Sequence, residues 1–353
     1  MRESVRQRRL SAKLLNKNGW KWKACTPEFC KPGGKHYSAG REAFYDETRY
    51  SVEMTQNTKP KEINMTMHTL CKNAFAHCRI STNAYLHQNT KMVTIAVANQ
   101  KGGVGKTTIA FNLAQILAVQ QEKNILAVDN DPQANLTSSF LEKPIESEAN
   151  VITAYDEEPL MPQKISESIG LLGSDTNLAA VAERDFSVIF RLKESLKTLQ
   201  TGPESKNFDF VIIDCLPSFG HLHLAALSAA DYVLIPVKPA PYALAGMKDL
   251  FETIKKAKKY FNANLKILGI VINQFDGRKP LIEREMEQVL REAYGELVFK
   301  TKINKRVKFE ESPAFQQAIT QYCPKEPAAK EFEALTAEIL QRLNQNELPI
   351  FEK

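Results

Sequence analysis

The segment Asn99-Gln-Lys-Gly-Gly-Val-Gly-Lys-Thr-Thr108 constrains the fold of this chain more than any other stretch. The mostly apolar run Met92–Val97 before it is typical of a buried strand, and the apolar spacing after it predicts a helix over 106–120 with one apolar face. That face consists of Ile109, Leu113, Ile116 and Leu117. Glycines between a strand and a helix let the backbone curl tightly and leave N–H groups at the positive end of the helix. This arrangement predicts a site for a phosphate group.

The two lysines of this segment have different predicted tasks. Lys106 and Thr107 stand where phosphate loops place the lysine that reaches the β- and γ-phosphates and the hydroxyl that contacts Mg²⁺. The general pattern G-x-x-x-x-G-K-[ST] needs a glycine at position 100, where this chain has Gln100 followed by a second lysine, Lys101. The sequence therefore predicts an unusual nucleotide-phosphate loop, in which the backbone of Gly102–Thr107 surrounds the anion.

Strands and helices alternate along the rest of the chain. Apolar runs predict strands at 125–128, 170–172, 208–213, 232–237 and 267–272. Helices are predicted near 185–200, 221–230, 242–260, 280–294 and 326–344. Such alternation is typical of a mostly parallel β-sheet flanked by helices on both faces, so we predict an α/β fold. Ligands of these folds bind beyond the carboxyl ends of the strands.

Carboxylates follow two of the predicted strands. Asp129 and Asp131 come directly after the strand at 125–128, and Asp214 ends the strand at 208–213. An aspartate at the end of an apolar strand beside a phosphate loop is typical of a Mg²⁺ site, although the Asp pair alone could instead cap a turn. His221 and His223 begin the next helix, and we interpret them as solvated or capping side chains rather than catalytic ones.

These segments together resemble the ParA/Soj family of DNA-partitioning ATPases, in the MinD/ParA branch whose deviant Walker A loop carries a second lysine. The resemblance covers about residues 92–345 and implies a P-loop NTPase fold with ATP and Mg²⁺ as cofactors. Its marks are Asn99–Thr108, Asp129–Asn135, Asp209–Gly220, Gly269–Asp276, Ile303–Pro313 and Tyr322–Lys330. Leu216 departs from the family's Asp-x-Pro-Pro pattern, but this change removes no ligand.

The resemblance also implies tasks for single residues. Lys101 is the signature lysine, which reaches across an ATP-bound homodimer to the phosphates of the other subunit and acts in catalysis with Lys106 and Asp131. Asp131 orients the attacking water, Thr107 offers its hydroxyl to Mg²⁺, and Asp129 and Asp214 hold the ion through its waters. Asn273 matches the adenine-reading position, and its amide offers both a donor and an acceptor. The implied nucleotide-binding residues are Lys101, Gly102, Gly103, Val104, Gly105, Lys106, Thr107, Thr108 and Asn273.

DNA binding is the second activity that the resemblance implies. Neutralisation of phosphates dominates non-specific DNA affinity, and the family's DNA-binding basic residues match Arg278, Lys305 and Lys308. The lysine cluster at 255–259 is a further candidate, although a lysine run on a helix is usually a solvated face. ATP binding would drive dimerisation and non-specific DNA binding, and a ParB-type centromere-binding protein would stimulate hydrolysis and release. The cargo could be a plasmid, a chromosome or a protein cluster.

A MinD-like membrane-positioning ATPase is the alternative function. It requires a basic amphipathic helix at the C-terminus, whereas residues 346–353 are short and contain Pro349. No apolar run is long enough to span a membrane, and the basic N-terminus lacks an apolar secretory segment. We therefore expect a cytoplasmic, nucleoid-associated protein without stable membrane association.

Residues 1–91 differ in composition from the predicted ATPase domain at 92–353. They carry 17 Lys/Arg and 7 Asp/Glu, whereas the remainder carries 30 and 34. Only 12 of these 91 residues are Ile, Leu, Val or Phe, so we predict a disordered or weakly folded extension. The spacing of its cysteines fits a zinc site poorly. A second hypothesis is that translation starts near Met92 and that residues 1–91 are a start-site artefact.

Overall fold

The computed structural model describes residues 92–201, 208–240, 243–278 and 280–345. The predictions for residues 1–91, including the zinc hypothesis, and for residues 346–353 lie outside the described residues.

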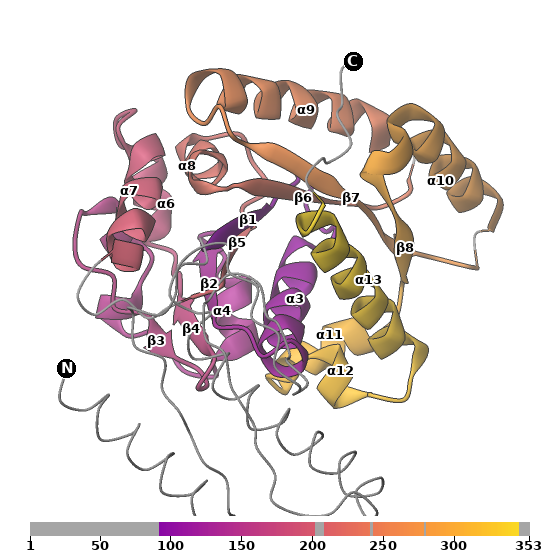
Figure 1. Cartoon of the computed structure of the whole chain (residues 1–353), viewed down its shortest axis with the longest axis horizontal. Helices are drawn as coiled ribbons and strands as arrows, with labels where there is room; N and C mark the ends of the chain where they lie inside the picture. The colour runs from indigo at the N-terminus through magenta and orange to yellow at the C-terminus, as the bar shows by residue number, and fades with distance from the viewer. Residues whose placement is uncertain (1–91, 202–207, 241–242, 279, 346–353) are drawn as a thin grey trace, which may run out of the picture. The chain divides into compact units, whose positions relative to one another are not determined.

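The described chain forms an eight-stranded sheet in the order β3-β4-β2-β5-β1-β6-β7-β8 (Figure 1). Neighbouring strands are parallel, except that β3 and β4 are antiparallel. The strands are β1 (Val93–Val97), β2 (Ile125–Asn130), β3 (Gln163–Lys164), β4 (Ile169–Leu172), β5 (Phe210–Cys215), β6 (Tyr232–Val237), β7 (Lys266–Phe275) and β8 (Val298–Asn304). The predicted mostly parallel sheet is confirmed, whereas the two edge strands, β3 and β8, were not predicted from the sequence.

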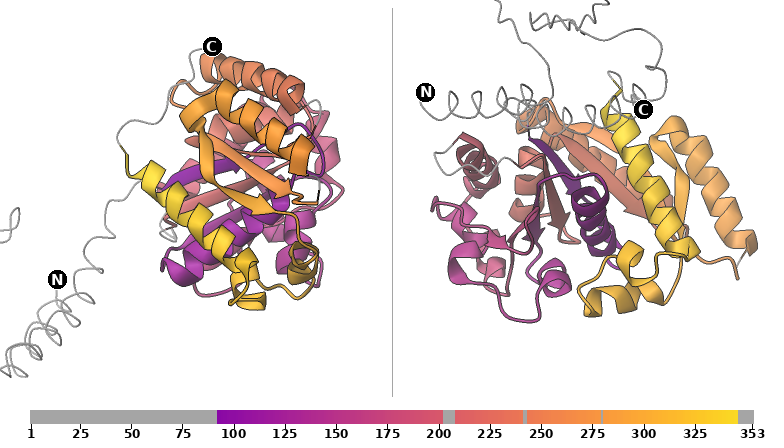
Figure 2. Two further views of the ribbon diagram at one scale, coloured as in Figure 1. Left: turned by 90° about the vertical axis from the view of Figure 1, so that its right-hand side faces the viewer. Right: turned by 60° about the horizontal axis from the view of Figure 1, so that its bottom comes forward.

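Helices cover both faces of this sheet, as predicted. They are α3 (Lys106–Gln120), α4 (Asn135–Phe140), α5 (Ile152–Tyr155), α6 (Leu178–Ala182), α7 (Val188–Thr201), α8 (His221–Ala229), α9 (Ala243–Tyr260), α10 (Pro280–Tyr294), α11 (Lys308–Ala314), α12 (Ile319–Tyr322) and α13 (Pro327–Leu343), with short 3-10 helices η2 (Ser147–Ala149) and η3 (Gly295–Leu297). Figures 1 and 2 show α8 and α9 on one side of the sheet and α3 and α13 on the other.

Side chains along each strand alternate between two hydrophobic cores, so helices pack on both faces of the sheet. In β5, Val211 and Ile213 belong to the core beneath α7, α8 and α9, whereas Phe210 and Ile212 belong to the core beneath α3 and α13. A strand buried on both faces reads as a continuous apolar run, and this is the signal that predicted β5.

Helix α3 differs from the amphipathic helix that the sequence predicted. Every residue from Ile109 to Ala118 is buried, because α3 packs against the sheet, α4 and α13 at once. Its polar Asn112 is satisfied inside this core: Nδ2 donates to the Thr108 carbonyl at 2.9 Å, and Oδ1 accepts from the Ile319 N–H at 2.7 Å. The helix that follows the glycine-rich loop is therefore fixed on all sides.

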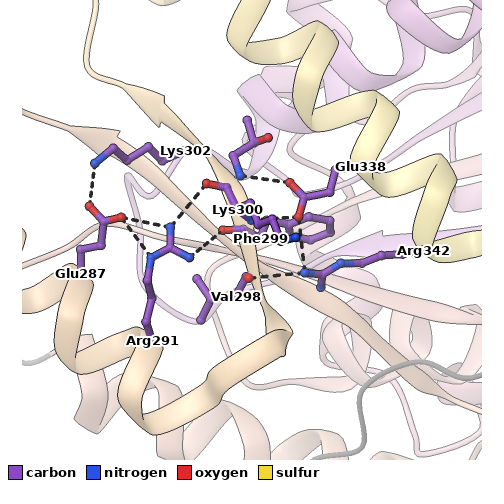
Figure 3. A network of polar contacts seen from close by, with 9 residues as sticks. Glu287, Arg291, Val298, Phe299, Lys300, Lys302, Glu338 and Arg342 are labelled. Carbon is purple, nitrogen blue, oxygen red and sulfur yellow. Dashed lines mark hydrogen bonds and ion pairs between the residues drawn. The ribbon is translucent and has the colours of Figure 1, made fainter.

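Charged side chains from α10 and α13 bind backbone groups of the edge strand β8 (Figure 3). Arg291 donates to the carbonyls of Phe299 and Lys300, and the carboxylate of Glu338 accepts from the N–H groups of Lys300 and Thr301 at 2.8 and 3.0 Å. These backbone groups are thereby unavailable to another strand, so the charges protect the edge from pairing with another chain.

The guanidinium of Arg342 ties α13 to β7 and β8. It lies 3.8 Å from the centre of the Phe299 ring, and its carbonyl acceptors are Leu268, Glu296, Leu297 and Val298. A Cβ at position 269 would lie 2.2 Å from its Nη1, so Gly269 leaves the space that Arg342 fills.

Candidate functional site

The carboxyl ends of β2, β5 and β1 lie side by side and bring the predicted aspartates to the glycine-rich loop. Asp129 and Asp214 are paired in register across β2 and β5, and Asp214 is also paired with Val97 at the end of β1. Asp129, Asp131 and Asp214 expose only 0%, 7% and 1% of their surface. The structure therefore joins three segments that the sequence predicted separately.

The glycine-rich loop enters α3 through Gly105, whose φ of 86° lies in the left-handed region that glycine favours. A Cβ at this position would lie 2.1 Å from Nδ2 of Asn273. Asn273 is buried, and Nδ2 donates to the Val104 carbonyl oxygen at 2.7 Å. Asn273 thus holds the loop from the end of β7. Its task as an adenine-reading residue stays a prediction.

The side-chain amides of Gln274 and Asn99 also position the loop, and neither role was predicted from the sequence. Gln274 has a φ of 55°, and its Nε2 donates to the Gly103 carbonyl at 2.9 Å. Consecutive strand residues point to opposite faces, so the left-handed backbone at Gln274 allows both amides to meet the same loop. On the other side, Asn99 donates to the Pro236 carbonyl at 2.6 Å and accepts from the Lys101 N–H at 2.9 Å.

The two lysines of the loop lie in opposite environments. Lys106 is buried, and its Nζ lies 3.5 Å from the Lys101 carbonyl oxygen. Burial lowers the pKa of Lys106, while the nearby carboxylate of Asp214 acts in the opposite direction. Lys101, by contrast, is exposed. One cation therefore belongs to the buried charge cluster, and the other is accessible to a second molecule.

Asp214 and Thr107 provide the oxygens that suit a magnesium ion. The Thr107 hydroxyl donates to Oδ2 of Asp214 at 2.6 Å, whereas Oδ1 of Asp214 is buried without a hydrogen-bond partner. Burial and the neighbouring Asp129 raise the pKa of Asp214 well above its usual range. A divalent cation would satisfy the orphaned oxygen and offset the excess negative charge, so these residues fit Mg²⁺.

No cluster of three or more His, Cys, Asp or Glu side chains suited to a metal occurs within the residues that the structure describes. Mg²⁺ at nucleotide sites keeps several waters and uses phosphate oxygens beside one or two protein ligands.

Asp129 and Asp131 are also structural residues of this site. The carboxylate of Asp129 accepts from the N–H and the hydroxyl of Thr137, both at 2.7 Å, and so holds the start of α4. Burial raises the pKa of Asp129 to about 6, against the effect of these hydrogen bonds. Oδ1 of Asp131 accepts from the Gln133 N–H at 2.9 Å. The predicted roles of both in Mg²⁺ binding and water orientation stay predictions.

The interpretation of His223 as a solvated or capping side chain is wrong. His223 is fully buried in α8, and neither ring nitrogen has a hydrogen-bond partner that meets ordinary geometry. Burial lowers its pKa to about 4, so the ring is neutral at physiological pH. The helical position 223 faces the core beneath the sheet, which the local sequence does not reveal.

The three predicted DNA-binding residues differ in how available their charges are. Arg278 is exposed and forms two hydrogen bonds of 2.9 Å to Asp276. Lys305 is also exposed, and it lies near Arg278 because its N–H donates to the Phe275 carbonyl at 2.8 Å. Within the described chain Lys305 forms no ion pair. Lys308 is paired with Glu326 at 2.5 Å. Arg278 and Lys305 are thus brought together. The charges of Arg278 and Lys308 are each balanced by a carboxylate, whereas that of Lys305 has no ion-pair partner in the described chain.

None of the described helices is long and apolar enough to cross a membrane.

Comparison with known proteins gives consistent results. Residues 92–267 match a family described as AAA domain. The chain is 34% identical over 267 residues to the chromosome-partitioning ATPase Soj of Thermus thermophilus, a match that covers 72% of this chain and 98% of that protein. It is 36% identical over 262 residues to the chromosome partitioning protein ParA of Myxococcus xanthus, covering 70% of this chain and 88% of that protein.

Similarity also extends to solved structures with bound nucleotide. The crystal structure of cobyrinic acid a,c-diamide synthase from Mycobacterium smegmatis, with an ATP analogue and magnesium, superimposes with a TM-score of 0.62 at 27% identity. The match covers 74% of this chain and 100% of that chain.

Proposed function

The chain belongs to the ParA/Soj family of partitioning ATPases, and on this premise we propose that it is a dimer switch that binds DNA non-specifically and releases it after ATP hydrolysis. The protein is an ATP hydrolase with ATP and Mg²⁺ as cofactors. In the proposed cycle, ATP binding drives homodimerisation, the dimer binds DNA, and a ParB-type centromere-binding protein stimulates hydrolysis.

The observation that carries this proposal is the contrast between the two loop lysines. Lys106 is buried beside the carboxylate of Asp214, while Lys101 is exposed on the same loop. In the proposed site Lys106 binds the phosphates of its own subunit. An exposed cation beside a phosphate site can reach the phosphates of a second subunit, where it stabilises the charge that develops during hydrolysis. The site is therefore completed by dimerisation.

The remaining residues prepare the site for hydrolysis. Backbone N–H groups of Gly102–Thr107 bind phosphate oxygens at the positive end of α3. When bound, Mg²⁺ neutralises charge on the β- and γ-phosphates. Thr107, Asp129 and Asp214 would hold that ion, and Oδ1 of Asp214 is a buried oxygen without another partner. Asp131 is anchored by the Gln133 N–H and orients the attacking water with its second oxygen.

Replacing Lys101 with alanine tests the switch. We expect Lys101→Ala to bind ATP with Mg²⁺ but to lose ATP-dependent dimerisation, measured by light scattering after size exclusion, together with ATP hydrolysis. Lys330→Ala removes an exposed lysine on α13 and serves as the matched control. A Lys101→Ala protein that dimerises and hydrolyses ATP like the wild type would show that the exposed lysine has no such role.

A further inference from the structure

Five rings form a contiguous surface over α7, α8 and α9, which we define as the aromatic surface: Phe186, Phe190, His221, Tyr260 and Phe261. The ring centre of Phe186 lies 6.4 Å from Phe190, 6.2 Å from His221 and 5.5 Å from Phe261. Phe186, Phe190 and Tyr260 expose 54%, 37% and 62% of their surface. Clustered exposed rings of this kind are typical of an interaction site, whereas single exposed apolar residues are ordinary.

Lysines border the aromatic surface. Lys256 and Lys259 precede Tyr260 by four and one positions on α9, and Nζ of Lys259 lies 4.9 Å from the centre of the Tyr260 ring. Neither lysine forms an ion pair with the part of the chain that the structure describes. On α7, Lys193 follows Phe190 by three positions and so lies on the same side of the helix. Carboxylates of Asp185 and Glu194 lie on the α7 side, so the basic charge is concentrated on the α9 side, where it complements an acidic partner.

The packing of the rings favours a protein segment over single-stranded nucleic acid. Bases bind by stacking on open ring faces. Here the rings meet edge to face or tilted, with interplanar angles of 71° and 55° from Phe186 to Phe190 and Phe261, and 72° between Phe190 and Phe261. The exposed rings therefore offer no row of parallel faces on which successive bases could stack. Their varied orientations leave apolar gaps between rings that suit an aliphatic or aromatic side chain.

We propose that the aromatic surface binds an acidic segment of a partner protein, which inserts one or more apolar side chains among the rings while its carboxylates meet the lysine border. Aromatic residues are enriched at protein interfaces, where they supply much of the buried apolar contact.

The position of the surface gives this binding a consequence for ATP turnover. His221 belongs to the surface and is also the first residue of α8, which begins after the loop that follows Asp214. Phe219 in that loop lies 6.3 Å from the ring of the buried His223. A segment bound to the surface would therefore restrain the loop next to the magnesium ligand. This consequence rests on the proposed function, whereas the binding itself does not.

Selection of displayed random peptides on the full-length chain tests the binding. We expect enriched peptides to combine Asp or Glu with large apolar residues. A synthetic copy, followed by fluorescence anisotropy, should bind at least about tenfold more weakly to the double variant Phe186→Ser/Phe190→Ser. Lys256→Glu/Lys259→Glu should weaken it as well, and this variant changes only exposed side chains. Leu281→Ser, at a residue of α10 that is 72% exposed, is the control that should bind normally.

Three results would overturn the proposal: no peptide that depends on the rings, enrichment of basic peptides, or loss of labelled single-stranded DNA binding instead of peptide binding in the ring variant. The assay needs no nucleotide, so its outcome is independent of the Lys101→Ala experiment. Turnover measured with and without the peptide then reports on the loop alone.

Discussion

Replacement of Asn273 with alanine distinguishes a residue that holds the phosphate loop from one that reads the base. In the structure Nδ2 of Asn273 donates to the carbonyl oxygen of the buried Val104 at 2.7 Å. The alanine variant leaves this carbonyl without a donor, and an unsatisfied buried polar group costs about 1–3 kcal/mol. If the loop must regain its shape when phosphate binds, this free energy lowers the affinity for ATP by roughly 5- to 150-fold.

The assay is calorimetric titration of the variant with ATP and, separately, with inorganic tripolyphosphate, both with Mg²⁺. Tripolyphosphate has no base, so a residue that acts through the loop lowers both affinities by the same factor. A residue that only reads adenine lowers the ATP affinity and leaves tripolyphosphate binding unchanged, and this second result would refute our reasoning. Gln274→Ala is the matched control: its bond to Gly103 is exposed to water, so we expect a loss of at most about 1 kcal/mol.

Three further predictions concern other parts of the protein. Since burial raises the pKa of Asp129 to about 6, the folded state holds this proton more tightly than the unfolded chain. Without nucleotide and Mg²⁺, the free energy of unfolding should therefore fall by up to about 3 kcal/mol as the pH rises from about 4 to about 6. Urea unfolding of the Asp129→Asn variant should not show this decrease. Arg342→Ala leaves carbonyls of β7 and β8 without donors and should lower the free energy of unfolding by about 3 kcal/mol or more, and Arg342→Lys should not restore it, because lysine lacks the planar fork. Lys305→Ala should weaken DNA binding and reduce its salt slope by about one, whereas Lys308→Ala should have a smaller effect because Glu326 already balances that charge; the opposite ranking would contradict the assigned surface.

Much of the phosphate site could be predicted from the sequence because its parts are local. Glycines, a lysine and a threonine between a strand and a helix specify a phosphate loop within ten residues. Buried strands can be recognised in the sequence as apolar runs. Asp129 and Asp214 follow such runs, and their pairing across β2 and β5 is a consequence of parallel strands ending at one edge. The edge strand β8 was missed for the opposite reason, since its lysines interrupt the apolar pattern.

The sequence by itself determined which residues form the predicted phosphate loop, because a glycine-rich turn before a helix needs no distant partner to create N–H groups that face an anion. Only the tertiary structure decided how that loop is held. Asn273 and Gln274 are 169 and 171 positions from the loop residues that they bind, and no local pattern relates such positions. The same holds for the burial of His223 and for the aromatic surface, whose rings come from three helices and their flanking residues. Contacts of this kind depend on how the helices pack on the sheet, and packing follows from the whole chain rather than from any one segment.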